Sequence, residues 1–365
     1  MKPAERFRNF QKYSPIEPFE VLSKRLGRKI EDIVKLDANE NPYGPAQAVK
    51  QSLANLNNIN IYPDPESRAL RAKLSEFTGV DQNLLLAGAG ADELIDLILR
   101  VMLEPGDVVI NCPPTFGMYP FDTRLNNGVV FEVTRNNDFS INTKKIREAI
   151  TENSAKILFL TSPNNPDGSL ILDEDLRQIL ELPVLVVLDE AYIEFTADTL
   201  TDWRKKSHIQ WVSSFENLVV LRTFSKWAGL AGLRVGYGAF PSWLLPSMWA
   251  AKQPYNVNVA ANQAAIESLK SLDFLTNNVR KIRQDQRKLF RMLSTIPFIE
   301  PVPSEANFIL CRVNNFSASY LKNFLLEKGI MVRYYETPLL ENYIRISVGK
   351  PDDHMRLMKA LEELQ

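Results

Sequence analysis

Four polar side chains stand where apolar, strand-like segments end. KILFLTS leads to Asn165, LPVLVVL to Asp189 and Tyr192, and NLVVLRTFS to Lys226. Ligands of open α/β sheets bind beyond the carboxyl ends of the strands, so these groups are expected to converge on one crevice. A lysine amine can form an imine with an aldehyde, and a carboxylate beside a ring nitrogen can keep it protonated. The set therefore points to covalent amine chemistry on a cofactor aldehyde.

Pyridoxal 5′-phosphate (PLP) requires this set of groups. Lys226 would form the imine, and Asp189 would keep the pyridine nitrogen protonated, so that the ring accepts electron density when the substrate Cα loses its proton. Tyr192 and Asn165 would hydrogen-bond the 3′ oxygen of the ring. Once a substrate amine displaces Lys226, the freed amine is the expected base for the proton shift. This chemistry needs no histidine, and the chain has only two.

The phosphate of such a cofactor needs backbone amides and cations. The sequence GAGADE, residues 88–93, precedes a helical pattern, and amides at a helix N-terminus bind anions. Thr223 and Ser225 offer hydroxyls, and Arg234 offers a guanidinium. Taken singly, each feature also fits a tight turn, a helix cap or a surface charge. Their occurrence together and in order favours a cofactor site.

The strand-like segments are apolar at consecutive positions, which is typical of strands buried on both faces of a mainly parallel sheet. Helical segments such as 173–182 would supply the crossovers. From about residue 262 the pattern becomes long, charged and helical, then strand-like, which indicates a separate α+β domain. With 365 residues to place, we expect an N-terminal arm over 1–45, a large cofactor-binding domain over 46–261 and a small domain over 262–365.

Composition excludes several other classes of function. A net charge of −1 gives no overall attraction to nucleic acid or to a membrane surface, and no apolar run approaches the length of a membrane span. Cys112 and Cys311 are far apart, outside any CxxC spacing, and predict buried thiols in a reducing compartment. The polar N-terminus does not resemble a secretory signal. We therefore expect a cytoplasmic protein without a metal site.

Many separated motifs match one family over nearly the whole chain: LDANENPYGP, YPDP, GADELI, CPPTFGMY, SPNNPDG, LDEAYIEF, RTFSKWAGLAGLRVGY and YIRISVGKP. In these the chain resembles the histidinol-phosphate aminotransferases, class II members of the fold-type I PLP-dependent aminotransferases. The resemblance implies a mainly parallel seven-stranded sheet in a large domain and a smaller α+β C-terminal domain. It also implies the exchange of an amino group between L-histidinol phosphate and 2-oxoglutarate, which gives imidazole-acetol phosphate and L-glutamate in histidine biosynthesis.

The resemblance assigns roles by position. Catalysis falls to Lys226, Asp189 and Tyr192, and cofactor binding involves these three together with Ala91, Asp92, Phe116, Asn165, Thr223, Ser225 and Arg234. Phe116 matches an aromatic residue that stacks on the pyridine ring, a geometry that is also physically sensible. Family members are homodimers, and Tyr62 matches a tyrosine that reaches the cofactor phosphate of the partner subunit.

Substrate recognition is expected to depend on two arginines. Arg333 and Arg345 match anion-binding arginines of the family, and a planar guanidinium can meet a carboxylate or a phosphate with two hydrogen bonds. We therefore expect glutamate and histidinol phosphate to share this anchor, with Asn39 and Tyr119 nearby. The chain departs from common family patterns at Asp167, where threonine is usual, and at Trp227, where a smaller or basic residue is common.

Other functions remain open at this stage. An aromatic amino-acid transaminase, or a PLP-dependent decarboxylase of a phosphorylated amino acid, would retain Lys226 and Asp189. The two arginines together with NENPYGP favour the histidinol-phosphate reaction. A non-catalytic regulator built on this fold usually carries an added DNA-binding segment, and no basic extension of that size precedes Ala46. An unrelated α/β binding protein is the remaining alternative.

Overall fold

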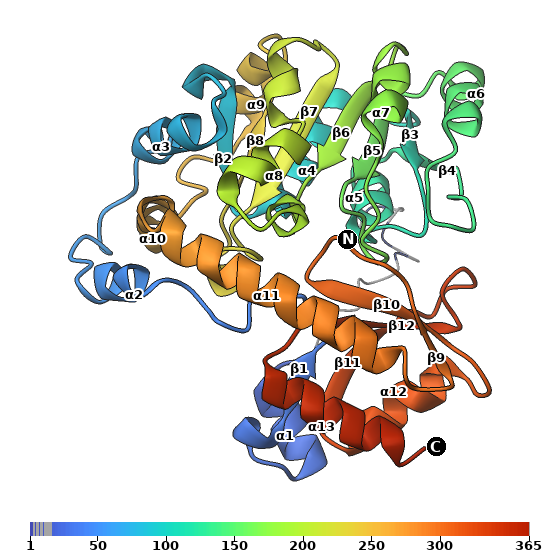
Figure 1. Ribbon diagram of the computed structural model, residues 1–365. Helices are drawn as coiled ribbons and strands as arrows, with labels where there is room; N and C mark the ends of the chain where they lie inside the picture. The colour runs from blue at the N-terminus through green and yellow to red at the C-terminus, as the bar shows by residue number, and fades with distance from the viewer. Residues whose placement is uncertain (3, 5–6, 8–9, 11–16, 365) are drawn as a thin grey trace.

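The computed structural model describes residues 1–2, 4, 7, 10 and 17–364. Its elements form two α/β bodies, each with its own sheet, joined by a long helix that runs across both (Figure 1). None of the helices in the described part of the chain is long and apolar enough to cross a membrane.

The larger sheet is built, in the described residues, from seven strands in the order β2-β8-β7-β6-β5-β3-β4. Their bounds, in that order, are Leu85–Gly88, Gly236–Ala239, Leu218–Thr223, Leu185–Asp189, Ile157–Thr161, Val108–Asn111 and Val129–Glu132. Strand β8 runs antiparallel to both neighbours, and the other pairings are parallel. The prediction of a mainly parallel seven-stranded sheet is confirmed.

Consecutive apolar residues in the central strands are explained by burial on both faces. In β6, Val186 and Leu188 pack into one hydrophobic cluster, and Leu185 and Val187 pack into the cluster on the other face. Successive side chains of a strand point to opposite faces, so a strand covered by helices on both sides must be apolar throughout. Helices α4, α5 and α9 cover one face, and α3, α6, α7 and α10 cover the other (Figure 1).

The connecting helices of this body are short to moderate in length. The α-helices are α2 (Gln47–Ala54), α3 (Arg68–Thr78), α4 (Ala91–Met102), α5 (Met118–Leu125), α6 (Thr143–Asn153), α7 (Asp173–Leu180), α8 (Leu200–Lys206), α9 (Leu245–Ala251) and α10 (Val259–Lys270). Single 3-10 turns are η3 (Gln82–Leu84), η4 (Ile193–Thr196), η5 (Ile209–Ser213) and η6 (Ala231–Leu233).

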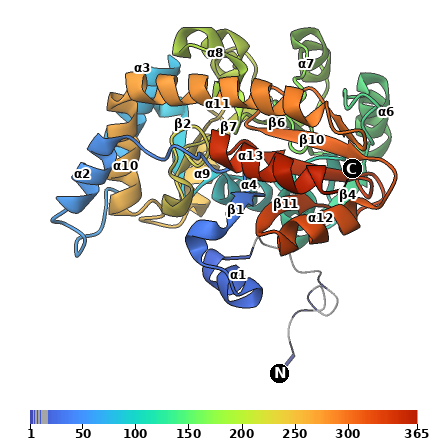
Figure 2. The same ribbon diagram turned by 60° about the horizontal axis from the view of Figure 1, so that its bottom comes forward.

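The smaller sheet has the order β1-β11-β12-β10-β9, with bounds Val34–Leu36, Ile330–Tyr334, Tyr343–Ser347, Phe308–Val313 and Ile299–Pro301. Strand β1 of the N-terminal arm pairs in parallel with β11, and the other pairings are antiparallel. The helical elements around this sheet are α1 (Phe19–Leu26), η2 (Ile30–Asp32), α11 (Leu272–Leu293), α12 (Ala318–Glu327) and α13 (Pro351–Glu362). Figure 2 shows α11 and α13 running together over one side of it.

The proposed division of the chain after residue 261 falls inside α10. The hydrophobic cluster of the larger body continues through α10 and along α11 as far as Ile282, whereas Leu289 and Leu293 at the end of α11 belong to the cluster of the smaller sheet. Helix α11 therefore packs against both bodies, and the site between them is built on packed elements.

Candidate active site

The carboxyl ends of the central strands supply the floor of a cavity of about 130 Å³. In the register of the sheet, Thr161 of β5 lies beside Asp189 of β6, which in turn lies beside Leu221 of β7. The cavity is lined by Ala91, Asp92, Phe116, Tyr119, Thr161, Asn165, Asp189, Ala191, Tyr192, Thr223, Ser225, Lys226, Ala231 and Arg234. Every residue that the sequence assigns to the cofactor lies here except Tyr62.

Asp189 is buried and held by two donors. The hydroxyl of Tyr119 donates to Oδ2 at 2.7 Å, and the backbone N–H of Ala191 donates to Oδ1 at 2.9 Å. Burial raises the pKa of Asp189 to about 6, while these two hydrogen bonds oppose the shift. A buried carboxylate of this kind favours a cationic partner, such as a protonated ring nitrogen.

The sequence predicts Tyr119 beside the substrate, and in the structure it lines the smaller cavity. It projects from α5 with its ring stacked on Phe159, and its hydroxyl reaches Thr161 as well as Asp189. The motif CPPTFGMY marks the segment as functional but does not indicate which way a side chain of the following helix points.

Lys226 lies where β7 has ended, with its Nζ donating to the carbonyl oxygen of Ala38 at 3.0 Å. Burial lowers the pKa of Lys226 to about 8, and the positive charge of Arg345 adds to this effect. A larger fraction of the amine is neutral at physiological pH than in an ordinary lysine, and the neutral amine is the nucleophilic form. The Ala38 carbonyl is a backbone group, so residue-type reasoning misses it, although it lies within the LDANENP motif.

Tyr192 and Asn39 meet on one side of the cavity. The side-chain amide of Asn39 donates to the Tyr192 hydroxyl at 3.0 Å, and Asn39 also bonds Ser347 of the smaller sheet through its backbone N–H and its Oδ1. Burial raises the pKa of Tyr192 to about 12, so the hydroxyl stays protonated and able to donate. A donor to an anionic ring oxygen is thereby in place.

The N-terminus of α4 forms an anion cradle with the segment after β7. Gly90 has φ +86°, a backbone conformation that residues with a side chain rarely adopt, and a Cβ built there would lie 2.6 Å from Nη2 of Arg234, which would have to move. Arg234 is bonded to Asp92 at 2.6 Å and to Ser225 Oγ at 3.4 Å. Amides at a helix start, hydroxyls and a guanidinium together match the needs of a phosphate.

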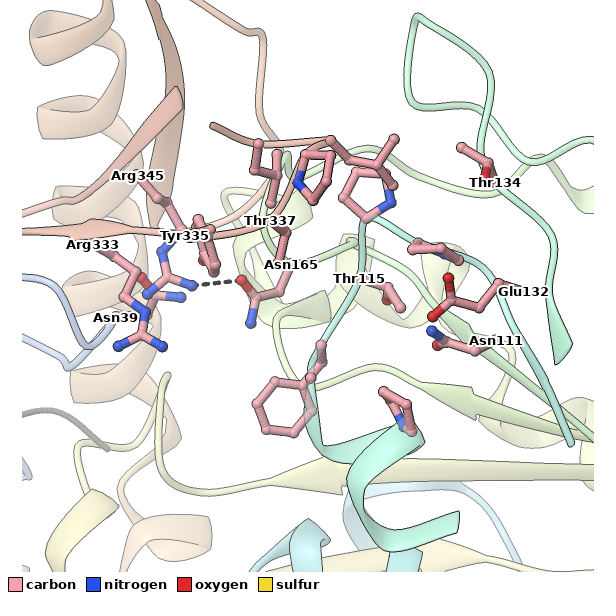
Figure 3. A pocket seen from close by; sticks show the side chains of 18 of the residues that line it. Asn39, Asn111, Thr115, Glu132, Thr134, Asn165, Arg333, Tyr335, Thr337 and Arg345 are labelled. Atoms are coloured by element: carbon pink, nitrogen blue, oxygen red, sulfur yellow. Dashed lines mark hydrogen bonds between the residues drawn. The ribbon is translucent and has the colours of Figure 1, made fainter. Parts of the chain in front are cut away.

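A second, larger cavity of about 710 Å³ adjoins the first, and Lys226, Asn165 and Tyr192 line both. Figure 3 shows Arg333 and Arg345 side by side at one end of it, with Asn165 facing them. The two arginines are directly paired across β11 and β12. Like charges opposite one another in a sheet are unfavourable unless an anion lies between or beside them.

Arg345 is buried and only partly satisfied by the protein. Its Nη1 donates to Asn165 Oδ1 at 2.5 Å and its Nη2 donates to the carbonyl oxygen of Asp37 at 2.7 Å. Its buried Nε has no hydrogen-bond partner among the described residues. A buried guanidinium N–H without an acceptor is costly, which favours an anionic ligand at this place.

Two further residues answer questions raised by the sequence. Trp227 is fully buried, stacks on Phe77 and donates to the Thr223 carbonyl, so it lies outside both cavities and does not narrow them. Asp167 is also buried and accepts hydrogen bonds from Asn164 and from the Ser169 backbone, which shapes the turn that carries Asn165.

Tyr62 lies outside both cavities and is 78% exposed. Its ring stacks on that of Tyr255 with the centroids 4.5 Å apart. The predicted role of Tyr62 at the cofactor phosphate of a partner subunit stays a prediction.

A sequence model of the aminotransferase class I and II family matches residues 31–361. The chain belongs to this family, whose members depend on PLP. Histidinol-phosphate aminotransferase of Nicotiana tabacum, named as chloroplastic, is 54% identical over 351 residues, which are 96% of this chain and 83% of that protein. Histidinol-phosphate aminotransferase of Roseiflexus castenholzii is 43% identical over 360 residues, 96% of this chain and 95% of that protein.

Solved structures give the same result for the fold. The histidinol-phosphate aminotransferase of Sinorhizobium meliloti, in complex with pyridoxal-5′-phosphate, superposes with a TM-score of 0.86 at 26% identity and covers 96% of each chain. The predictions of the family, the fold class and the cofactor are confirmed.

The donor set of the smaller cavity fits PLP. A primary amine with a lowered pKa lies at one side, a buried carboxylate lies at the floor, and a cradle that a Cβ at Gly90 would fill lies at the other end. Lys226, Asp189 and Arg234 would hold the aldehyde, the ring nitrogen and the phosphate, respectively.

Proposed function

We propose that the chain transfers an amino group between L-histidinol phosphate and 2-oxoglutarate, giving imidazole-acetol phosphate and L-glutamate in histidine biosynthesis. Relatives named for this activity are 43–54% identical over 96% of the chain. The proposed substrate is supported above all by the Arg333–Arg345 pair, which lines the same cavity as Lys226. The two amino donors, histidinol phosphate and glutamate, differ in structure, but each has an anionic group. A guanidinium can bind either a phosphate or a carboxylate with two hydrogen bonds.

PLP, when bound, supplies the electron sink that makes a substrate Cα acidic. The residues of the chain would hold the cofactor, orient the substrate and move the proton. Asp189 would keep its charge next to the ring nitrogen, and the Tyr192 hydroxyl would donate to the ring oxygen. Arg345 orients the substrate by its anion, so that the proton at Cα faces the amine of Lys226, which removes it and returns it during transfer.

The free Lys226 amine is suited to this exchange because its pKa lies near 8. Close to neutral pH it is able both to accept and to release a proton, which is the requirement for a base that must act in each direction. Asn39 and Asn165 would keep Tyr192 and Arg345 in position, since each is hydrogen-bonded to one of them.

We also propose a homodimer in which Tyr62 of one subunit reaches the cofactor phosphate of the other. The exposed Tyr62–Tyr255 pair, on a segment with Ile59 and Ile61 exposed as well, supports a contact surface at this place. We keep the cytoplasm as the proposed compartment, on the basis of two buried free thiols. Light scattering of the purified protein tests the dimer, and cell fractionation tests the compartment.

The decisive experiment is an assay of the PLP-loaded enzyme with 2-oxoglutarate and one of three donors: histidinol phosphate, phenylalanine or tyrosine. The proposal predicts a kcat/KM for histidinol phosphate at least about 100-fold above that for either aromatic amino acid, since a phosphate brings more negative charge to the two arginines than a carboxylate does. A preference for an aromatic donor would overturn the substrate and leave the chemistry in place. Release of carbon dioxide from threonine phosphate, without amino transfer, would favour the decarboxylase alternative.

A further inference from the structure

The side chains of the turn that follows β6 point in two directions, some toward the cofactor cavity and others into the protein interior. Asp189 and Tyr192 line the cofactor cavity. Glu190 and Glu194, on the same turn, point into the protein interior, where they are 0% and 1% exposed and line neither cavity. Two carboxylates without access to water require strong partners.

The main partner is Arg222 on the neighbouring strand β7, which is itself 0% exposed. Its Nη2 donates to Glu194 Oε1 at 2.5 Å, and its Nη1 lies 3.8 Å from Glu190 Oε2. Its guanidinium lies over the ring of Trp203, 4.4 Å from the centroid. Although burial alone would lower the pKa of Arg222, Glu194 holds it above its ordinary value, so the arginine remains charged.

Glu190 is fixed by further donors from the segment before η5. The backbone N–H of His208 donates to Oε1 at 2.6 Å, and the Ser207 hydroxyl donates to Oε2 at 2.5 Å. Arg222 also donates to the Ser207 hydroxyl at 3.4 Å. The rear of the turn is therefore held by directional bonds to β7 and to the segment at residues 207–208.

A role in stability alone does not account for this arrangement. Apolar side chains of similar volume stabilise an interior at least as well as a buried ion pair does, because removing charges from water is costly. Apolar contacts, however, do not fix direction, whereas a guanidinium bound to a carboxylate does. Arg222 also lies on the segment that continues to Thr223, Ser225 and Lys226, so it ties together the two strand ends that form the cofactor floor.

We propose that Arg222, through Glu190 and Glu194, is a positioning residue that fixes the turn 189–192, so that Asp189 and Tyr192 meet the cofactor ring in the geometry that amino transfer needs. Arg222 touches neither cavity and acts only through the turn. The inference rests on the proposed amino-transfer function, and wild-type activity toward histidinol phosphate tests that function separately.

The test compares PLP-loaded wild type with Arg222→Met and Arg222→Lys. In Arg222→Met we expect the dissociation constant for PLP to rise about tenfold or more. We expect the midpoint of the visible-absorbance titration with pH to move by at least about 0.5 unit, because the groups around the ring are displaced. The kcat should fall about 100-fold, with both Michaelis constants changed by less than about threefold. Arg222→Lys, which keeps the charge, should recover part of each effect.

Arg222→Met leaves Glu194 without its guanidinium partner, and a buried carboxylate without a partner can prevent folding. The double variant Arg222→Met/Glu194→Gln removes this charge together with the arginine, and its folding is checked by circular dichroism. Arg71→Met is the matched control, because Arg71 is also buried but bonds the Gln82 carbonyl, away from the turn. It should lose stability and keep the wild-type titration midpoint.

Two results would overturn the proposal. One is a folded Arg222 variant, single or double, whose PLP affinity and absorbance midpoint equal those of wild type. The other is an equal shift in the Arg71 control, which would show that loss of any buried arginine has this effect.

Discussion

The cofactor cavity and the anion end of the site are built in different ways. The first is formed by the ends of neighbouring parallel strands in the larger sheet. Its carboxylate is held by bonds within that body, while the Tyr192 hydroxyl and the Lys226 amine also bond Asn39 and Ala38 of the N-terminal arm. The second is formed by a cross-strand pair of arginines in the smaller sheet and by the N-terminal arm, and it opens into the larger cavity. We therefore expect the larger sheet to determine the chemistry and the smaller sheet to determine which substrate is bound.

The largest loss of activity is expected when the Lys226 amine is removed. Lys226→Ala should reduce kcat by at least about 10⁴-fold for every donor, because the covalent attachment and the proton transfer both depend on it. The measurement is amino transfer by the PLP-loaded enzyme with each donor in turn. The control Lys322→Ala, at a half-buried lysine of α12 that lines neither cavity, should retain wild-type activity. Substantial activity in Lys226→Ala would contradict the assignment.

A change at the cavity floor should affect turnover and spare substrate binding. Asp189→Asn removes the charge that favours a protonated ring nitrogen, so kcat should fall about 100-fold to 1000-fold. Because Arg345 and Arg333 are untouched, the Michaelis constants for glutamate and histidinol phosphate should stay within about threefold. Steady-state kinetics with both donors measure this, and a rise in KM at constant kcat would show that the two regions are not separate.

A milder change at the same floor is Tyr119→Phe. The Tyr119 hydroxyl opposes the effect of burial on Asp189, so its loss should raise the pKa of Asp189 above about 6. The carboxyl signal of Asp189 in ¹³C NMR of the cofactor-free protein should then titrate at higher pH than in wild type. The kcat of the loaded enzyme should fall by less than about tenfold. An unchanged or lowered midpoint would mean that this hydrogen bond does not control the carboxylate.

The smallest effect is expected outside both regions, at Asp122 on α5. Burial raises its pKa from 3.8 to about 7, and the nearby Asp96 and Asp92 add to the shift. The folded state then binds more protons than the unfolded state between these pH values, so stability falls as pH rises from about 4 to 7. Asp122→Asn should raise the free energy of unfolding by about 1–2 kcal/mol at pH 8 and change it little at pH 4. Urea unfolding at the two pH values measures this, and equal stability at pH 8 would contradict it.

Much of the cofactor cavity was predictable, because its residues follow strands whose apolar runs are visible in the sequence. Parallel strands place such residues at one edge, so Asn165, Asp189 and Lys226 had to lie near one another. The motifs added Arg234 and the glycine turn. These features are local in sequence or repeat a known pattern.

The remainder depends on long-range register and on side-chain direction. Nothing in the sequence pairs Arg333 with Arg345, since that pairing follows from how β11 and β12 align. The carbonyl groups of Asp37 and Ala38 act through the backbone and carry no residue signature. Arg222 stands within the apolar segment NLVVLRTFS, and only the fold shows that its charge is buried beside Glu190 and Glu194.

The most direct test of the separation between chemistry and substrate is steady-state kinetics of Arg345→Ala with glutamate and with histidinol phosphate as donors. Arg312→Ala, an exposed arginine on β10 of the same sheet, serves as the control. Both donors are expected to place an anion on Arg345. We therefore expect both Michaelis constants to rise together, by about 10-fold to 100-fold, with a smaller change in kcat. A rise for one donor alone would contradict the shared anchor.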